Sequence, residues 1–139
     1  MAFLTADRKS IRKDGAIFAY PVASNTVIYA GALTAIDEDG NAVPAGSSQA
    51  RRLVGKADMR GDNSNGASGD VIVTGHREGV YEYTTASDVT RSDIGRPVFV
   101  VDDQTVDVRR DEKSIYAGTI VYVEGSRSVF VDLLGAVRR

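Results

Sequence analysis

The pair Gly55-Lys56 is the first candidate for chemistry, because this dipeptide occurs in phosphate-binding P-loops. A P-loop also requires a glycine five residues before the Gly-Lys pair and a hydroxyl residue directly after it. Ala50 and Ala57 occupy these two positions, so both required groups are missing. We interpret the pair as a strand glycine beside an exposed lysine.

A calcium loop is the second candidate, since Asp37, Asp39 and Asn41 alternate as the oxygen ligands of an EF-hand-type loop do. Such a loop needs a glycine at its sixth position and a bidentate glutamate at its twelfth. Ala42 and Ser48 stand at those positions. Residues 37–41 are better explained as a tight turn, in which the glycine before Asn41 adopts a positive φ.

His76 is the sole histidine of the chain, and there is no cysteine. A catalytic triad would need this histidine beside a hydroxyl and a carboxylate, and no serine is flanked by the glycines of a nucleophile elbow. One histidine without cysteine also disfavours zinc. We interpret His76 as a surface residue at the tip of a hairpin between Gly75 and Gly79. We expect a protein that is not an enzyme and has no cofactor, catalytic residue or metal site. An enzyme remains a rival interpretation, and it would require His76 to be buried beside a carboxylate and a hydroxyl.

Aromatic residues could stack nucleic-acid bases, because Tyr81 and Tyr83 share one strand face and Tyr116 and Tyr122 share another. The basic residues are dispersed, however, and 17 Lys and Arg are balanced by 19 Asp and Glu, which gives a formal net charge of -2. Packing between neighbouring strands is therefore the favoured role of the tyrosines.

The length and composition of the chain fit one globular domain with an ordinary apolar core. It has 139 residues, 42% of them apolar, and the lack of cysteine excludes a disulfide framework. No apolar run approaches the roughly 18 residues of a membrane-spanning helix, and the N-terminus lacks the pattern of a signal peptide. We expect a soluble protein that stays, or assembles, in the compartment where it is made.

Short runs of strand-forming residues begin at Ala16 and are separated by glycine-rich and polar turns. Residues 71–73 and 80–83 are predicted to form a hairpin. Residues 115–123 and 129–134 form a second one, whose two faces both carry apolar groups. We therefore predict an all-β fold, a compact β-barrel or β-sandwich of short antiparallel strands. At most one or two short helical turns are expected, one of them at residues 90–95.

Two segments differ from this strand pattern, and they define the domain organisation that we expect. Residues 1–15 form an extended N-terminal arm, and residues 16–139 form a single β domain. Residues 60–69 carry almost no apolar side chain and are predicted to form an exposed, flexible loop. These two segments are the least able to pack on their own core, so we expect them to face a partner. The expected partner-binding residues are Phe3, Leu4, Arg8, Lys9, Ile11, Arg12, Lys13, Arg60, Asp62, Asn63 and Asn65.

Turn glycines and strand residues recur in a characteristic order along the domain. The segments are YAGAL at 29–33, DGNAVPA at 39–45, LVGKA at 53–57, GASGDVIV at 66–73, GVY at 79–81, DIGRPVFV at 93–100, AGTIV at 117–121 and VFVDL at 129–133. In this order and spacing, the chain resembles a family of tailed-bacteriophage capsid decoration (cement) proteins. The resemblance covers about residues 16–134. The family's opening is usually shorter and less charged, so it assigns no role to residues 1–14.

The resemblance implies a structural virion protein without a catalytic site. Such a protein binds the outer surface of the phage major capsid shell as homotrimers and stabilises the expanded head. Its partners would be the major capsid protein and other copies of itself, with no membrane and no direct contact with nucleic acid. It would be made in the host cytoplasm and reside on the outer capsid surface of the virion. A phage tail or baseplate structural protein is the alternative, followed by a nucleic-acid-binding β-barrel.

Overall fold

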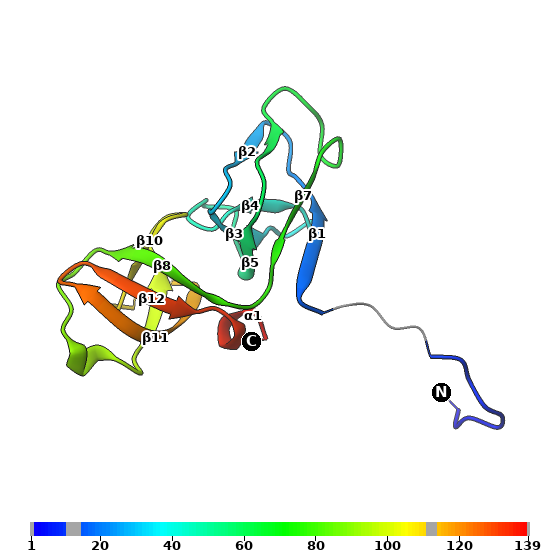
Figure 1. Ribbon diagram of the computed structural model, residues 1–139. Coiled ribbons are helices and arrows are strands. Elements are labelled where there is room, and N and C mark those ends of the chain that lie inside the picture. The colour runs from blue at the N-terminus through cyan, green and yellow to red at the C-terminus, as the bar shows by residue number, and fades with distance from the viewer. Residues whose placement is uncertain (1, 11–14, 111–113, 139) are drawn as a thin grey trace.

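The computed structural model describes residues 2–10, 15–110 and 114–138. The prediction of an all-β fold with at most two short helical turns is confirmed: the strands form a five-stranded sheet, a closed five-stranded barrel and a two-stranded sheet. Figure 1 shows the barrel beside the N-terminal strands, and the N-terminal arm reaching away from both.

The five-stranded sheet has the order β1-β7-β5-β3-β4, and its neighbouring strands are antiparallel. Its strands are β1 (Ile17–Pro21), β3 (Leu33–Ile36), β4 (Ala42–Pro44), β5 (Arg52–Ala57) and β7 (Ile72–His76). The predicted turn between β3 and β4 is confirmed, since Asp37 Oδ1 accepts the backbone N–H groups of Asp39 at 2.9 Å and Asn41 at 2.8 Å. The carboxylate therefore stabilises a turn.

The barrel has the order β10-β8-β12-β11-β9 and contains one parallel pair, β8 with β10. Its strands are β8 (Val80–Thr85), β9 (Pro97–Val100), β10 (Thr105–Asp107), β11 (Tyr116–Gly125) and β12 (Ser128–Asp132). The predicted C-terminal hairpin is confirmed as β11–β12. The predicted alternation of two side-chain faces along β11 is wrong. The pairing of β11 with β9 and with β12 contains register shifts, so Ala117 and Ile120 are both buried while Thr119 is half-buried.

The predicted hairpin between residues 71–73 and 80–83 is wrong. β7 pairs with β1 and β5, whereas β8 pairs with β12 and β10, so the connection between them crosses from the sheet to the barrel. Gly75 lies within β7, where a Cβ would come 2.1 Å from the Lys56 carbonyl oxygen and 2.6 Å from the Phe18 ring. This glycine therefore permits close packing of a strand and a ring and does not form a turn.

Two hydrophobic clusters hold these layers together. The larger one combines sheet residues such as Leu33 with barrel residues such as Ile120, both fully buried. The smaller one contains Phe18 and Val73 of the five-stranded sheet and Ile28 of the two-stranded sheet. The five-stranded sheet thus contributes to both cores, and burial of each large side chain contributes about 1.5–3 kcal/mol.

The remaining elements are short. The two-stranded sheet consists of β2 (Thr26–Ile28) and β6 (Gly61–Asn63). The predicted helical turn near residues 90–95 is confirmed as η1 (Arg91–Asp93), where an Asp93 carboxylate oxygen accepts the backbone N–H of Thr90 at 2.8 Å. A final turn, α1 (Leu134–Val137), packs on the larger core.

Candidate partner-binding surfaces

The N-terminal arm is exposed throughout residues 2–10 and has no helix or strand there. The side chains of Phe3 and Leu4 are 98% and 72% exposed, and Arg8 and Lys9 are exposed as well. Figure 1 shows the segment 2–10, at the blue end of the chain, lying clear of the folded body. The predicted partner-binding residues Ile11, Arg12 and Lys13 lie outside the described residues.

The segment 60–69 is more ordered than its composition predicted. Gly61–Asn63 form strand β6, because pairing with β2 uses backbone groups and does not require apolar side chains. The prediction of a fully exposed loop is therefore corrected. Within it, Asn63 is only 3% exposed, and its side-chain amide donates to the carbonyl oxygens of Val22, Ala23 and Ala67. Asn63 stabilises the loop from inside and is not available to a partner.

The other predicted residues of this segment are exposed. Arg60 lies with its guanidinium 5.3 Å from the centre of the Tyr29 ring, a cation–π contact. Asn65 is exposed and lies in the turn that follows β6. Asp62 is also exposed, and hydrogen bonds from the side chain and backbone of Ser64 lower the pKa of its carboxyl group. These three side chains are accessible for contact.

The structure does not bring the arm and the segment 60–69 together. In Figure 1 the arm and the loop between β6 and β7 extend from different ends of the N-terminal sheet. The arm and the segment 60–69 are therefore attached at different ends of the sheet.

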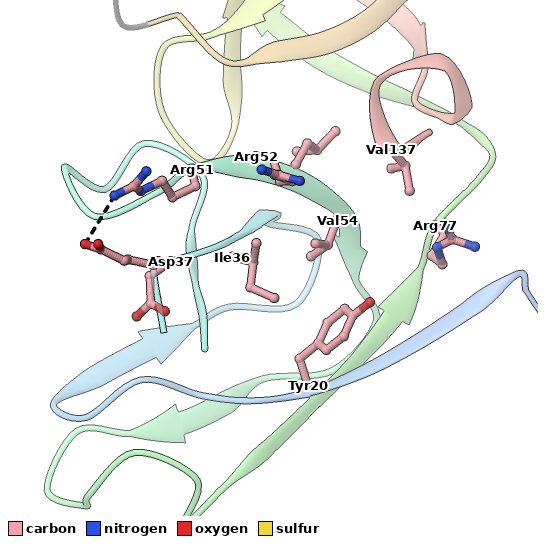
Figure 2. Close-up of a pocket in the computed structure, with 10 residues that line it drawn as sticks. Tyr20, Ile36, Asp37, Arg51, Arg52, Val54, Arg77 and Val137 are labelled. Carbon is pink, nitrogen blue, oxygen red and sulfur yellow. Dashed lines mark ion pairs between the residues drawn. The ribbon is translucent and has the colours of Figure 1, made fainter. Parts of the chain in front are cut away.

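A third surface, which we name the arginine furrow, was not predicted from the sequence. It is an open depression of about 410 Å³. Figure 2 shows Ile36 and Val54 at its centre, with Arg51 and Asp37 on one side and Arg77 on the other. The apolar residues are Tyr20, Ile36, Leu53, Val54 and Val137, the cationic residues are Arg51, Arg52 and Arg77, and the acidic residues are Asp37 and Glu38.

The three arginines of the furrow have different partners. Arg51 forms an ion pair with Glu38 at 3.2 Å, drawn as a dashed line in Figure 2. Arg77 Nη1 donates to the carbonyl oxygen of Gly15 at 2.8 Å. Within the described part of the chain, neither Arg52 nor Arg77 has a carboxylate partner. The guanidinium groups of Arg52 and Arg77 therefore face the furrow with N–H donors that no carboxylate of the described residues occupies.

A charged cluster joins the ends of β5 and β7. His76 Nδ1 lies 2.6 Å from one carboxylate oxygen of Asp58, and Lys56 Nζ lies 3.2 Å from the other. The Lys56 ammonium also lies 4.6 Å from the centre of the Tyr81 ring. The His76 side chain is 42% exposed and lies at the end of a strand, not at the predicted hairpin tip. This arrangement ties two strands together at the surface.

Metal-binding groups and membrane helices were sought over the described ranges. In residues 2–10, 15–110 and 114–138 there is no cluster of three or more His, Cys, Asp or Glu side chains that could hold a metal ion. No helix in these ranges is long and apolar enough to cross a membrane. Comparison with protein-family models, curated proteins and solved structures gave no match.

Proposed function

We propose that this chain is a structural virion protein that binds the outer surface of a phage major capsid shell and stabilises the expanded head, as trimers. The resemblance of residues 16–134 to capsid decoration proteins motivates the proposal. The observation that carries it is the arm, whose apolar residues Phe3 and Leu4 are exposed. Apolar groups at the end of such an arm suit attachment to a neighbouring subunit.

The energetics of the arm indicate how such an attachment would work. Burying Phe3 and Leu4 in a partner would contribute about 1.5–3 kcal/mol each. Fixing the backbone of residues 2–10 costs roughly 1–2 kcal/mol per residue, which exceeds that gain. Backbone hydrogen bonds and ion pairs of Arg8 and Lys9 with the partner must therefore add to the binding. Several such subunit contacts on one shell combine by avidity, so no single contact has to be strong.

The proposal is tested by co-sedimentation with expanded heads of the parent phage that lack this protein. We expect saturable binding at a fixed ratio to capsid subunits, and no binding to unexpanded heads. Failure to bind either form would refute the proposal. Binding to isolated tails would then support the tail or baseplate alternative.

Removal of the arm should lower capsid binding without unfolding the domain. Deletion of residues 2–13 is expected to reduce head occupancy at limiting protein while leaving the melting temperature unchanged, because the described arm residues are all exposed. The double variant Phe3→Ser with Leu4→Ser tests the apolar contribution separately, since it keeps the length and charge of the arm, and it should lower occupancy as well. Unchanged occupancy in the deletion variant would exclude the arm from binding.

A further inference from the structure

The arginine furrow combines two properties that together define a ligand. Its floor is apolar, with Val54 only 9% exposed and Tyr20 partly buried. Its edges carry the guanidinium groups of Arg52 and Arg77, which lack carboxylate partners within the described residues. Guanidinium groups bind carboxylates through paired hydrogen bonds in a fixed plane. The furrow therefore fits a ligand with both apolar and anionic groups.

The local charge favours an anionic ligand although the whole chain is slightly acidic. Of the two acids in the furrow, Glu38 is already paired with Arg51. A second depression of about 290 Å³ shares Arg51 and Arg52 with the furrow and adds Arg110, whose guanidinium lies 5.6 Å from the centre of the Phe99 ring. Positive charge therefore continues along the seam between the sheet and the barrel.

The same charges argue against two other occupants. The arm of a second copy carries Arg8 and Lys9, which the furrow arginines would repel. A nucleic-acid strand carries a phosphate at every nucleotide and would therefore also place phosphates beside Asp37, whereas a peptide can carry its carboxylates only where Arg52 and Arg77 lie. A peptide with carboxylates at its ends and apolar residues between them avoids both conflicts.

The furrow also lies at the root of the arm, because Arg77 donates to the carbonyl oxygen of Gly15. We propose that the arginine furrow is a docking site for an acidic, partly apolar segment of the major capsid protein. This inference rests on the proposed function and assigns the capsid-facing surface of the body. The capsid segment would place carboxylates at Arg52 and Arg77 and an apolar side chain on Val54 between them.

Charge reversal of Arg52 tests the inference directly. Arg52 is exposed at the start of β5, so the variant Arg52→Glu should fold normally. In co-sedimentation with expanded heads, we expect its apparent Kd to rise at least tenfold, and that of Arg52→Gln to rise less. Arg91→Glu is the matched control, since Arg91 is exposed on η1 and is not a furrow residue. Its Kd should stay within twofold of the unmodified protein.

The outcomes separate this inference from the proposed function. If the unmodified protein binds heads and Arg52→Glu binds them equally well, the furrow inference is overturned and the proposed function stands. If the unmodified protein does not bind heads, the furrow inference and the proposed function are both refuted. A rise in Kd for Arg52→Glu that Arg91→Glu reproduces would also overturn the inference, because it would report overall charge.

Crosslinking identifies the occupant independently of affinity. The chain has no cysteine, so Glu38→Cys provides a single thiol for a benzophenone maleimide at the edge of the furrow and leaves Arg52 and Arg77 in place. After irradiation with expanded heads, mass spectrometry should recover a capsid-protein peptide that contains Asp or Glu beside apolar residues. Recovery of a peptide from a second copy of this chain, a nucleotide adduct, or a capsid peptide without acidic residues would overturn the inference.

Discussion

Replacement of the buried Asn63 should destabilise the protein more than replacement of any exposed residue in the same loop. The Asn63 side-chain amide donates to the carbonyl oxygens of Val22 and Ala23, both at 3.1 Å, and of Ala67 at 2.8 Å. These bonds tie the strand β6 and the following loop to the chain after β1. Asn63→Ala removes all of them at once.

The expected magnitude follows from the partners that remain. In the variant, the carbonyl oxygens of Val22 and Ala67 keep backbone N–H donors from Gly69 and Asp70. The carbonyl of Ala23 has no other donor among the described residues, so it bears the largest loss. Each net hydrogen bond contributes about 0.5–1.5 kcal/mol, and an unsatisfied buried group costs about 1–3 kcal/mol. The free energy of unfolding should therefore fall by about 2–3 kcal/mol.

Thermal unfolding followed by circular dichroism measures this effect. At about 3–4 °C per kcal/mol for a domain of this size, the melting temperature should fall by roughly 6–12 °C. Asn65→Ala is the control, because Asn65 is exposed two residues away and its loss should change stability by less than about 0.5 kcal/mol. Equal melting temperatures for the two variants would refute the structural role of Asn63 and return it to the partner-binding surface.

Two further substitutions test the close packing of the sheet and the interior of the barrel. Gly55→Ala should cost about 3 kcal/mol or more, since φ is +148° and a Cβ would come 2.1 Å from the His76 carbonyl oxygen, whereas Gly125→Ala in open space should be nearly neutral. Tyr83→Phe should be neutral or stabilising at pH 7, because the buried Tyr83 hydroxyl has no hydrogen-bond partner among the described residues. Burial, followed by the nearby Tyr81, raises the pKa of Tyr83 in the folded protein. The free energy of unfolding is therefore unaffected by this group below about pH 10 and falls above it, where the tyrosine of the unfolded chain ionises. Denaturant unfolding between pH 7 and 11 should therefore show a steeper loss of stability above pH 10 in the unmodified protein than in Tyr83→Phe.

Most of the strands could be predicted because each is a local pattern, whereas β6 was missed because Gly61–Asn63 carry no apolar side chain and pair through their backbone. Alternating and continuous apolar runs predicted the C-terminal hairpin, and the Asp and Gly residues of 37–41 predicted the turn between β3 and β4. The pairing of distant strands could not be predicted in the same way. β7 joins β1 and β5 in the sheet, and the deciding contact is the Phe18 ring over Gly75, which are far apart in the sequence.

The same contrast between local patterns and distant contacts applies to the candidate surfaces. The exposed arm was predicted from its charge and its few apolar residues, which are properties of a local segment. The buried position of Asn63 could not be predicted, because its partners Val22 and Ala23 lie about 40 residues earlier in the chain. The arginine furrow was missed for this reason too, because its residues lie in or next to β1, β3, β5, β7 and α1. The adjacent pair Arg51-Arg52 before a strand was the one local signal of a concentrated positive charge.

The position of the arm relative to the furrow links the two proposed contacts physically. The arm begins at Gly15, whose carbonyl oxygen is bound by the furrow residue Arg77. A segment from Ala2 to Gly15 can reach at most about 45 Å from that point when fully extended. A capsid segment held in the furrow would therefore bring its own subunit, or the next one, within reach of Phe3 and Leu4. The second contact then forms within one complex, at an effective concentration that two separate binding events would not provide. The arm and the furrow are thus expected to act together in attaching one subunit to two neighbouring positions on a shell.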